Sequence, residues 1–552
     1  MGYVEWRDDA PAGPPLLVQH DGRLLLDTTA RAAPSVADGL RRFAELEKCV
    51  GDYHVYRLTR HSLWHAAAAG VTAARIADFL ARAAGAPPPP GLARRIAATL
   101  DRYGRVALVR EGGALRLRAD DPALLATLAV RLDLPAPGAD GAVGLPEDAR
   151  GAVKERLARL GYPARDEAGY AAGAPLAAAW RPGTALRAYQ REALAAFVAR
   201  GSGLVLLPCG AGKTLVGIGA TVTLGCSTLV LCPHATSARQ WLDAYAACTD
   251  LPPADLGEYG PRRRAVRPVT VTTYQMLAAR RGRGGERAHL DLFGARDWGL
   301  IVYDEAHLLP ADVFRLTAAL QSRRRLGLTA TPVREDGREG DLFALVGPVL
   351  YRARWGRLEE EGWIAPARCA EVRVPLPGGA PDLTHREAAA SAAKWPVVRA
   401  LLRRHAGEPA LVIGHYVAQL RALADRLGAP LVTGATPAAE RERLFAAFRA
   451  GEVPVLVLSR VGNAALDLPN AAVALEVSGN FGSRQEEAQR LGRILRPKGG
   501  RPAHFYLVVA DDPAERAHAA RRQRYLVEQG YRYTILDARE VMSDESVPSD
   551  ER

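Results

Sequence analysis

Lysine is scarce in this chain of 552 residues. Of its 73 lysine and arginine residues only five are lysine, at positions 48, 154, 213, 394 and 498, which leaves 68 arginines. A lysine kept where arginine is the usual cation indicates a position that requires a compact ammonium group. Lys213 is such a position, because it lies in the glycine-rich sequence GAGKT at 210–214.

Cysteine and long apolar runs are also lacking. The six cysteines include no C-x-x-C pair, which argues against a zinc site or a disulfide framework and predicts that they are small core residues. No stretch reaches the roughly 18 uninterrupted apolar residues of a membrane helix, and the N-terminal residues lack a secretory apolar segment. We therefore expect a cytoplasmic protein with no membrane partner.

Length and charge narrow the class further. A chain of 552 residues is too long for one core and predicts about three domains. The formal net charge of +12 favours a polyanionic partner, although an arginine-rich composition is basic without any selection for binding. Arginine clusters at 262–264 and 280–283 therefore fit solvated loops as well as phosphate contacts.

The segment around Lys213 has the pattern of a nucleotide-phosphate site. The apolar run at 203–207 predicts a buried parallel strand, and a helix is expected from Thr214 onward. The loop at 210–212 would then place backbone amides and a helix N-terminus around phosphates. A glycine loop has room for an ammonium group, whereas a guanidinium is larger and binds two acceptors at fixed geometry. The match is incomplete, because the strict spacing requires glycine at position 207, which is leucine.

A second pattern supports this site. The apolar run at 300–303 predicts another buried strand, and it ends directly in Asp304 and Glu305. Two acids at the end of a buried strand are costly unless a cation lies beside them, and Mg²⁺ on a nucleotide would supply that cation. Asp304 would hold the metal through its water shell, and Glu305 would accept a proton from the attacking water.

Short apolar runs alternate with helical stretches over two regions, 180–365 and 366–540. Strands are predicted at 204–207, 228–232, 269–272, 300–303 and 326–328 in the first region, and at 410–413, 430–432, 454–458, 472–477 and 504–509 in the second. This alternation is typical of parallel α/β domains, so we expect two of them with a cleft between. Residues 541–552 are polar and acidic and are predicted to be a disordered tail.

Residues 1–170 follow another pattern. Helices are predicted at 58–66, 72–80 and 92–103, and a hairpin is predicted from 105–110 and 115–118. This order resembles a winged helix, a fold that binds proteins as well as DNA. We therefore expect an accessory domain and leave DNA and protein open as its ligand.

Seven short motifs occur in the order found in superfamily 2 helicases. They are LRAYQ at 186–190, PCGAGKT at 208–214, LCP at 231–233 with QW at 240–241, TTYQ at 272–275, DEAH at 304–307, LTATP at 328–332 and QRLGRILRP at 489–497. The chain therefore resembles superfamily 2 helicases over 180–540, and among them the XPB family in its bacterial form. The narrower resemblance depends on VREDG at 333–337, on the run at 479–485 and, less strongly, on the segment 60–69.

The resemblance implies two RecA-like motor domains that bind ATP and Mg²⁺. The implied nucleotide contacts are Arg187, Gln190, Gly210, Ala211, Gly212, Lys213, Thr214, Asp467 and Gln489, with Thr214 and Asp304 at the metal. Gln190 offers both a donor and an acceptor to an adenine edge. Asp467 matches the family motif that contacts the ribose.

The resemblance also implies roles in catalysis and in coupling to DNA. The implied catalytic residues are Lys213, Asp304, Glu305, Arg493 and Arg496, and the implied coupling residues are His307, Thr329, Thr331, Arg334, Glu335 and Asp336. Arg493 and Arg496 lie three residues apart on one helical face, so both can reach a γ-phosphate as arginine fingers from the second domain. The triplet at 334–336 is linked in the family to strand separation.

The sequence thus predicts an ATP-driven DNA helicase or translocase that moves 3′→5′ in DNA repair or genome maintenance. Its substrate would be single-stranded or forked DNA, and a repair nuclease or another repair protein would act alongside. Three alternatives stay open: a duplex translocase that remodels DNA with little unwinding, an RNA helicase, and a repair or transcription adaptor with a vestigial motor. The triplet at 334–336 argues against RNA, and the intact site residues argue against the adaptor.

One departure from the family bears on unwinding. XPB-like proteins carry a sizeable helical thumb between the motor domains, whereas this chain has only the stretches 374–381 and 383–393 at that place. The proline and glycine residues of the first stretch cannot continue a helix. We therefore expect weak unwinding that is limited to short duplexes.

Overall fold

Backbone contacts divide the chain into two units. A computed structural model describes residues 14–50, 52–208, 210–279, 289, 291–309, 323–330, 339–353, 355–363, 367–376, 384–459, 471–478, 502–528 and 532–543. The first unit comprises 1–207 and 213–352, and the second comprises 208–212 and 353–552. None of the helices within the described ranges combines the length and the apolar character that a membrane crossing requires.

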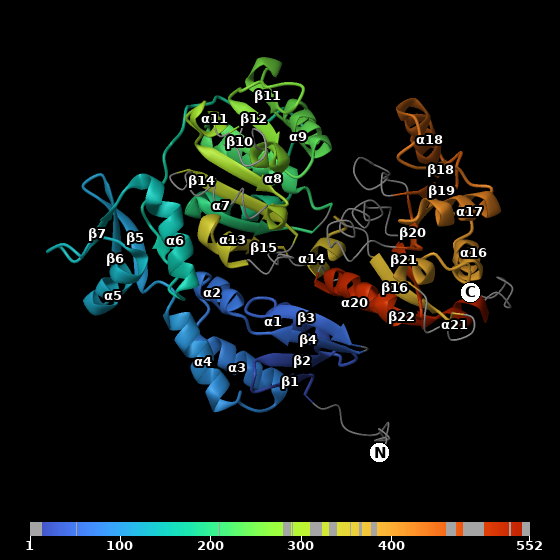
Figure 1. The fold of residues 1–552 in the computed structure, drawn as a ribbon, viewed down its shortest axis with the longest axis horizontal. Coiled ribbons are helices and arrows are strands. Elements are labelled where there is room, and N and C mark those ends of the chain that lie inside the picture. The colour runs from blue at the N-terminus through green and yellow to red at the C-terminus, as the bar shows by residue number, and fades with distance from the viewer. Residues whose placement is uncertain are drawn as a thin grey trace. The chain divides into compact units, whose positions relative to one another are not determined.

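A parallel sheet of seven strands forms the motor part of the first unit, in the order β11-β12-β10-β13-β14-β9-β15 (Figure 1). Its strands are β9 (Ser202–Leu206), β10 (Thr228–Cys232), β11 (Leu256–Tyr259), β12 (Val269–Thr273), β13 (Leu300–Asp304), β14 (Arg324–Thr329) and β15 (Val349–Arg352). Every pairing is parallel, which confirms the predicted α/β class. The five predicted strands are all present, and β11 and β15 are the two edge strands that the sequence did not predict.

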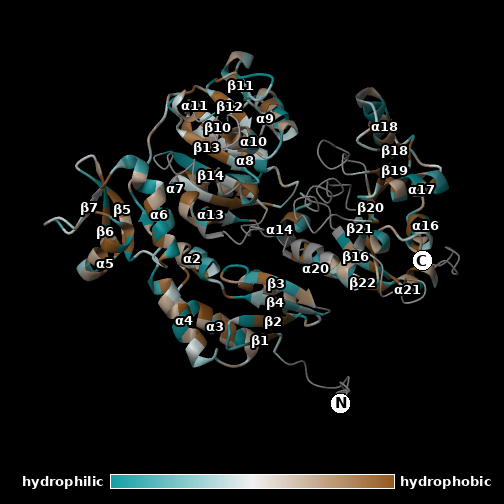
Figure 2. Ribbon diagram, viewed as in Figure 1, coloured by the Kyte–Doolittle hydropathy of each residue, from teal (hydrophilic) through white to brown (hydrophobic). Residues whose placement is uncertain are grey.

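Helices cover this sheet. They are α7 (Ala188–Arg200), α8 (Lys213–Leu224), α9 (Ala235–Cys248), α10 (Tyr274–Ala278), α11 (Asp291–Gly294) and α13 (Glu339–Leu345). Because helices lie over a parallel sheet, its central strands are largely buried. Strands β9 and β10 are buried at every residue, and Figure 2 shows the hydrophobic colour concentrated on the strands.

The second unit contains another parallel sheet of seven strands, in the order β18-β19-β17-β20-β21-β16-β22. The strands are β16 (Ala367–Val374), β17 (Ala410–Ile413), β18 (Leu431–Val432), β19 (Val455–Leu458), β20 (Val473–Glu476), β21 (Ala503–Ala510) and β22 (Arg532–Asp537). The helices are α14 (Trp355–Glu360), α15 (His385–Ala389), α16 (Lys394–Arg404), α17 (Val417–Leu427), α18 (Ala438–Ala450), α20 (Pro513–Glu528) and α21 (Ala538–Ser543). The five strands predicted for this region are confirmed, and two tandem α/β motor folds are therefore present.

A buried lysine stabilises the second unit. The Lys394 ammonium donates to Glu515 Oε1 at 2.6 Å, to the Val477 carbonyl at 2.8 Å and to the Ala389 carbonyl at 3.0 Å. Both side chains of the Lys394–Glu515 pair are 2% exposed, so the charges compensate each other away from water. This lysine joins α15, α16, α20 and the end of β20 around three acceptors that a compact ammonium can reach together.

The N-terminal region, residues 14–170, contains two small sheets instead of one winged helix. The first is antiparallel, in the order β1-β2-β4-β3, and the second has the order β7-β6-β5-β8. The elements are β1 (Leu16–Val18), β2 (Arg23–Asp27), α1 (Ala33–Leu40), β3 (Glu45–Val50), β4 (Tyr53–Arg57), α2 (Arg60–Ala68), α3 (Ala73–Ala84), α4 (Pro90–Asp101), β5 (Val106–Glu111), β6 (Ala114–Ala119), α5 (Pro122–Leu132), β7 (Val143–Leu145), α6 (Arg150–Arg159) and β8 (Arg165–Asp166).

The expected helices and hairpin form, but they belong to different cores. Strands β5 and β6 meet at Gly112 and Gly113, whose φ angles of +57° and +82° are those of a tight hairpin turn. The apolar side of the hairpin packs with α5 and α6 in one hydrophobic cluster. The hairpin therefore has its own helices, and it is not a wing on α2–α4.

Candidate nucleotide site

The predicted phosphate loop connects a fully buried strand to a helix. Strand β9 ends at Leu206, and α8 begins at Lys213. In the loop between them, Gly210 and Gly212 have φ angles of +80° and +72°, a left-handed conformation that glycine adopts without strain. Lys213 is therefore presented by the first turn of a helix, where backbone amides favour an anion.

Lys213 contacts the second of the two adjacent acids. Its ammonium lies 2.6 Å from Glu305 Oε1, and the two side chains are 11% and 23% exposed. Burial alone would raise the pKa of Glu305, but the charges of Lys213 and His307 outweigh it and lower that pKa. Glu305 also has a φ of +47°, an unusual value for a residue with a side chain. Such strain is typical of a residue whose position serves a function.

Asp304, the last residue of β13, is held from two sides. The Trp241 indole donates to Asp304 Oδ2 at 3.0 Å, and the Tyr274 hydroxyl donates to the Asp304 carbonyl at 2.6 Å. Burial, and next the neighbouring charge of Glu305, raises the pKa of Asp304 to about 6. A cation beside both carboxylates would relieve each of these effects, so this pair of acids fits a divalent metal.

His307 links the acids to the next strand. Its Nδ1 lies 2.8 Å from the hydroxyl of Thr329, the last residue of β14, and 3.6 Å from Glu305 Oε2. His307 and Thr329 are both buried, so water does not compete for this hydrogen bond. His307 already lies beside Glu305, so a shift of β14 would move His307 relative to that carboxylate.

Gln190 lies at the start of α7, where it is 1% exposed. Its Oε1 accepts from the backbone N–H of Arg187 at 2.9 Å and so caps the helix, while Arg187 donates to the Tyr189 hydroxyl at 3.2 Å. Gln190 Oε1, the acceptor expected for an adenine edge, thus already accepts a hydrogen bond from the protein backbone. Thr214, the second residue of α8, is half-buried.

Sequence reasoning gave no role to Trp241 or Tyr274, although both lie in recognised motifs. Trp241 sits on α9 against Gly217 of α8, where a Cβ atom would come within 2.5 Å of the indole ring. The indole thus fills the space between the helix that carries Lys213 and the strand that ends in Asp304. The motifs themselves do not reveal these contacts, because Trp241 and Tyr274 each reach Asp304 through tertiary packing.

The other predicted site residues lie outside the described residues. They are Thr331, Arg334, Glu335, Asp336, Asp467, Gln489, Arg493 and Arg496. The structure therefore brings together Lys213, Asp304, Glu305, His307 and Thr329. The roles assigned to these five and to the other eight stay predictions.

Family models match three parts of this chain. The model described as ERCC3/RAD25/XPB C-terminal helicase matches residues 358–550. The model described as the res subunit of type III restriction enzymes matches 183–334, and one described as a helicase conserved C-terminal domain matches 16–135. The matches at 183–334 and 358–550 fall on the two α/β folds.

Curated relatives match along nearly the whole chain. A protein named DNA 3′-5′ helicase XPB from Kineococcus radiotolerans is 49% identical over 549 residues, which cover 97% of this chain and 98% of that protein. A protein of the same name from Mycobacterium tuberculosis is 48% identical over 543 residues, with coverages of 96% and 98%. The general transcription and DNA repair factor IIH helicase/translocase subunit XPB of Antonospora locustae is 33% identical, with coverages of 97% and 83%.

Proposed function

Since this chain belongs to the XPB family of DNA 3′-5′ helicases, we propose that it couples ATP hydrolysis to 3′→5′ movement along DNA and to strand separation. The observation that supports this best is the Lys213–Glu305 contact beside Asp304, because it joins a phosphate-binding cation to a base and a metal-binding acid. By analogy with the relatives, we propose DNA repair as the setting, a repair nuclease or another repair protein as a partner, and the cytoplasm as the location.

We assign the parts of the proposed site as follows. Lys213 would bind the β- and γ-phosphates, and the Thr214 hydroxyl and Asp304 would hold Mg²⁺. Held there by Thr214 and Asp304, Mg²⁺ would supply positive charge to offset the charge of the phosphates. Glu305 would accept the proton of the attacking water.

The Lys213–Glu305 ion pair would be broken when a nucleotide binds. A nucleotide phosphate competes with Glu305 for the Lys213 ammonium. Lys213 lies 2.6 Å from Glu305 Oε1, so movement of its ammonium toward phosphate would release the Glu305 carboxylate. We propose that the base is therefore freed when ATP binds, and that it is held by Lys213 when ATP is absent.

We propose that the second motor fold supplies the remaining groups. Arg493 and Arg496 would contact the γ-phosphate, Gln489 and Asp467 would contact the nucleotide, and hydrolysis would require both folds. The hydroxyls of Thr329 and Thr331 would report the nucleotide state, and the triplet at 334–336 would act on DNA.

ATP hydrolysis with different nucleic acids tests the proposed function. We expect single-stranded DNA to stimulate hydrolysis more than RNA, and a 3′-tailed duplex to be opened while a 5′-tailed one is not. A Lys213→Ala variant should lose hydrolysis by a factor of about 10² to 10³ or more, because it removes a charged phosphate contact. Equal stimulation by RNA, or rapid hydrolysis by Lys213→Ala, would contradict the proposal.

The short connection in the second unit favours a second candidate, a duplex translocase with little unwinding. Among the described residues between β16 and α16, the helix present is the five-residue α15, which spans about 7.5 Å at roughly 1.5 Å per residue. This helix is shorter than the stretch 383–393 that the sequence suggested. Strand displacement on tailed duplexes of increasing length separates the candidates, because a translocase would displace a triplex strand yet fail on long duplexes.

Trp241→Phe is expected to weaken the response to Mg²⁺ by about 10- to 100-fold, because it removes the hydrogen bond that orients Asp304 while an aromatic ring is kept. The measurement is the Mg²⁺ concentration that gives half-maximal hydrolysis, together with binding of a fluorescent ATP analogue. Tyr245→Phe is the matched control, since that hydroxyl bonds Thr221 at 2.6 Å and does not contact Asp304. An identical Mg²⁺ response in Trp241→Phe and the wild type would contradict the assignment.

A further inference from the structure

Helix α13 belongs to two cores. Leu342 and Leu345 pack into the core of the seven-stranded sheet. Phe343 and Ala344 instead form a separate cluster with Trp64 and other residues of the N-terminal region. Helices α6 and α2 both pack against α13, as Figure 1 also shows. This short helix therefore joins the motor sheet to the N-terminal region.

Phe343 is seated among aromatic rings of the N-terminal region. Its ring centroid lies 5.9 Å from that of Trp64, 4.9 Å from that of His65 and 6.0 Å from that of Tyr103. The side chain is 5% exposed, and aromatic pairs at these separations add specific geometry to hydrophobic burial. His65 adds a polar contact, because its Nδ1 accepts from the backbone N–H of Val349 at the start of β15.

A buried charge cluster forms a second joint, at β14. Asp166 of β8 accepts from Arg150 at 2.6 Å and from Lys154 at 2.8 Å. The Tyr170 ring lies 5.4 Å from the Arg150 guanidinium and 5.6 Å from that of Arg325, the second residue of β14. Arg150 and Arg325 are both fully buried, so this strand begins inside a charge cluster that the N-terminal region supplies.

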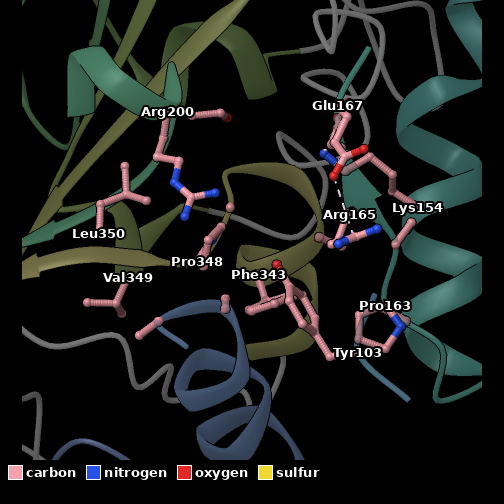
Figure 3. A pocket seen from close by; sticks show the side chains of 18 of the residues that line it. Tyr103, Lys154, Pro163, Arg165, Glu167, Arg200, Phe343, Pro348, Val349 and Leu350 are labelled. Carbon is pink, nitrogen blue, oxygen red and sulfur yellow. Dashed lines mark hydrogen bonds and ion pairs between the residues drawn. The ribbon is translucent and has the colours of Figure 1, made fainter. Parts of the chain in front are cut away.

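Residues of the aromatic cluster and of the charge cluster line one cavity. A cavity of about 390 Å³ lies between the N-terminal region and the motor sheet, with Tyr103, Lys154 and Phe343 in its walls. Figure 3 shows Tyr103 and Phe343 side by side at this cavity, whose lining also includes Arg165 and Arg200. Around this cavity, the side chains that meet across the joint set its geometry.

Strand β14 carries this joint to the nucleotide site. It begins in the charge cluster with Arg325 and ends at Thr329, whose hydroxyl bonds His307. In the sheet register Leu328 pairs with Asp304. A displacement of β14 would therefore reach His307 and both acids within the length of one strand.

We propose that the N-terminal region positions β14 and α13 for DNA-stimulated hydrolysis, and that Phe343 is a positioning residue in this joint. The inference rests on the proposed function, because it concerns the stimulation of the same site by DNA. A reacting geometry that shifts by about 1 Å can lose about 10²-fold in rate, so a loosened joint has a measurable effect without any contact to ATP.

The test is Phe343→Leu in the full chain, compared with Phe197→Leu. Phe197 lies on α7 and is equally buried, and no ring contact joins it to the N-terminal region among the described residues. We expect Phe343→Leu to lower DNA-stimulated kcat about 10- to 100-fold with KM for ATP within about twofold, and Phe343→Tyr to restore the rate. Phe197→Leu should lower the thermal midpoint while kcat is kept.

Equal kcat in Phe343→Leu and Phe197→Leu would overturn the inference. If Phe343→Leu fails to fold, Tyr103→Leu disturbs the same contact from the N-terminal side, and a wild-type response to DNA in that variant would overturn it equally. A wild-type protein that DNA does not stimulate would instead contradict the proposed function. Deletion of residues 1–170 is unsuitable, because it would expose the Phe343 face of α13 and leave Arg325 buried without Asp166.

Discussion

Glu305→Gln is expected to slow ATP turnover by a factor of about 10² to 10⁴ while ATP and DNA stay bound. Glutamine keeps the size of the side chain but cannot accept the proton of the attacking water at neutral pH. The left-handed backbone of Glu305 is no obstacle, because the two residues have similar steric requirements. The measurement is single-turnover hydrolysis together with binding of a fluorescent ATP analogue.

The structure adds a second expectation for this variant. Glu305→Gln removes the ion pair with Lys213, so phosphate no longer competes with a carboxylate at position 305 for the Lys213 ammonium. ATP binding should therefore be as tight as in the wild type or tighter. Glu192→Gln is the control, since Glu192 accepts from the Tyr351 hydroxyl away from the acids. A Glu305→Gln protein that turns over near the wild-type rate would leave Glu305 as a partner of Lys213 alone.

Arg496→Ala is expected to lower turnover about 10³- to 10⁵-fold, the range that arginine fingers supply in phosphoryl transfer. The physical reason is that a guanidinium stabilises charge on the γ-phosphate oxygens most strongly in the transition state. The affinity for ATP should change much less than the rate. Measuring kcat and KM, with nucleotide binding determined separately, distinguishes the two effects.

Two further variants sharpen this prediction. Arg496→Lys keeps the charge but loses the paired donors, so it should recover only part of the rate if the contact is bidentate. Arg516→Ala removes an exposed arginine that pairs with Asp511, and turnover should be unchanged. A pure loss of ATP binding in Arg496→Ala, with kcat preserved, would speak against the arginine-finger role.

The sequence predicted the buried strands well because burial leaves a local signature. All ten predicted strands are present, since a strand covered on both faces has to be apolar along its length. Strands β16 and β22 lack that signature, and the sequence did not predict them. Glu371 of β16 is 2% exposed yet accepts from Arg373 and from the Tyr533 hydroxyl of β22. This buried carboxylate is tolerated because both of its oxygens accept hydrogen bonds, and the bond from Tyr533 comes from the neighbouring strand, which no local pattern shows.

The scarce lysines show which features the sequence determines and which depend on the tertiary structure. The sequence by itself determined that Lys213 belongs to a phosphate loop, and that the acids at 304 and 305 end a buried strand, because spacing and residue type are sufficient for both. The tertiary structure decided which carboxylate three of the lysines meet: Glu305 for Lys213, Asp166 for Lys154 and Glu515 for Lys394. The pairs of Lys213 and Lys394 join segments far apart in the chain, where packing sets the distances.

The N-terminal region shows the same division. Its helices and the hairpin at Gly112 and Gly113 follow from caps and turn residues, which act over a few positions. The seating of Phe343 against Trp64 and Tyr103, in contrast, depends on contacts across more than two hundred residues of sequence. Local chemistry therefore determined the helices, the hairpin and the nucleotide motifs. Only long-range packing decided how the N-terminal region contacts β14, the strand that ends at Thr329 beside His307.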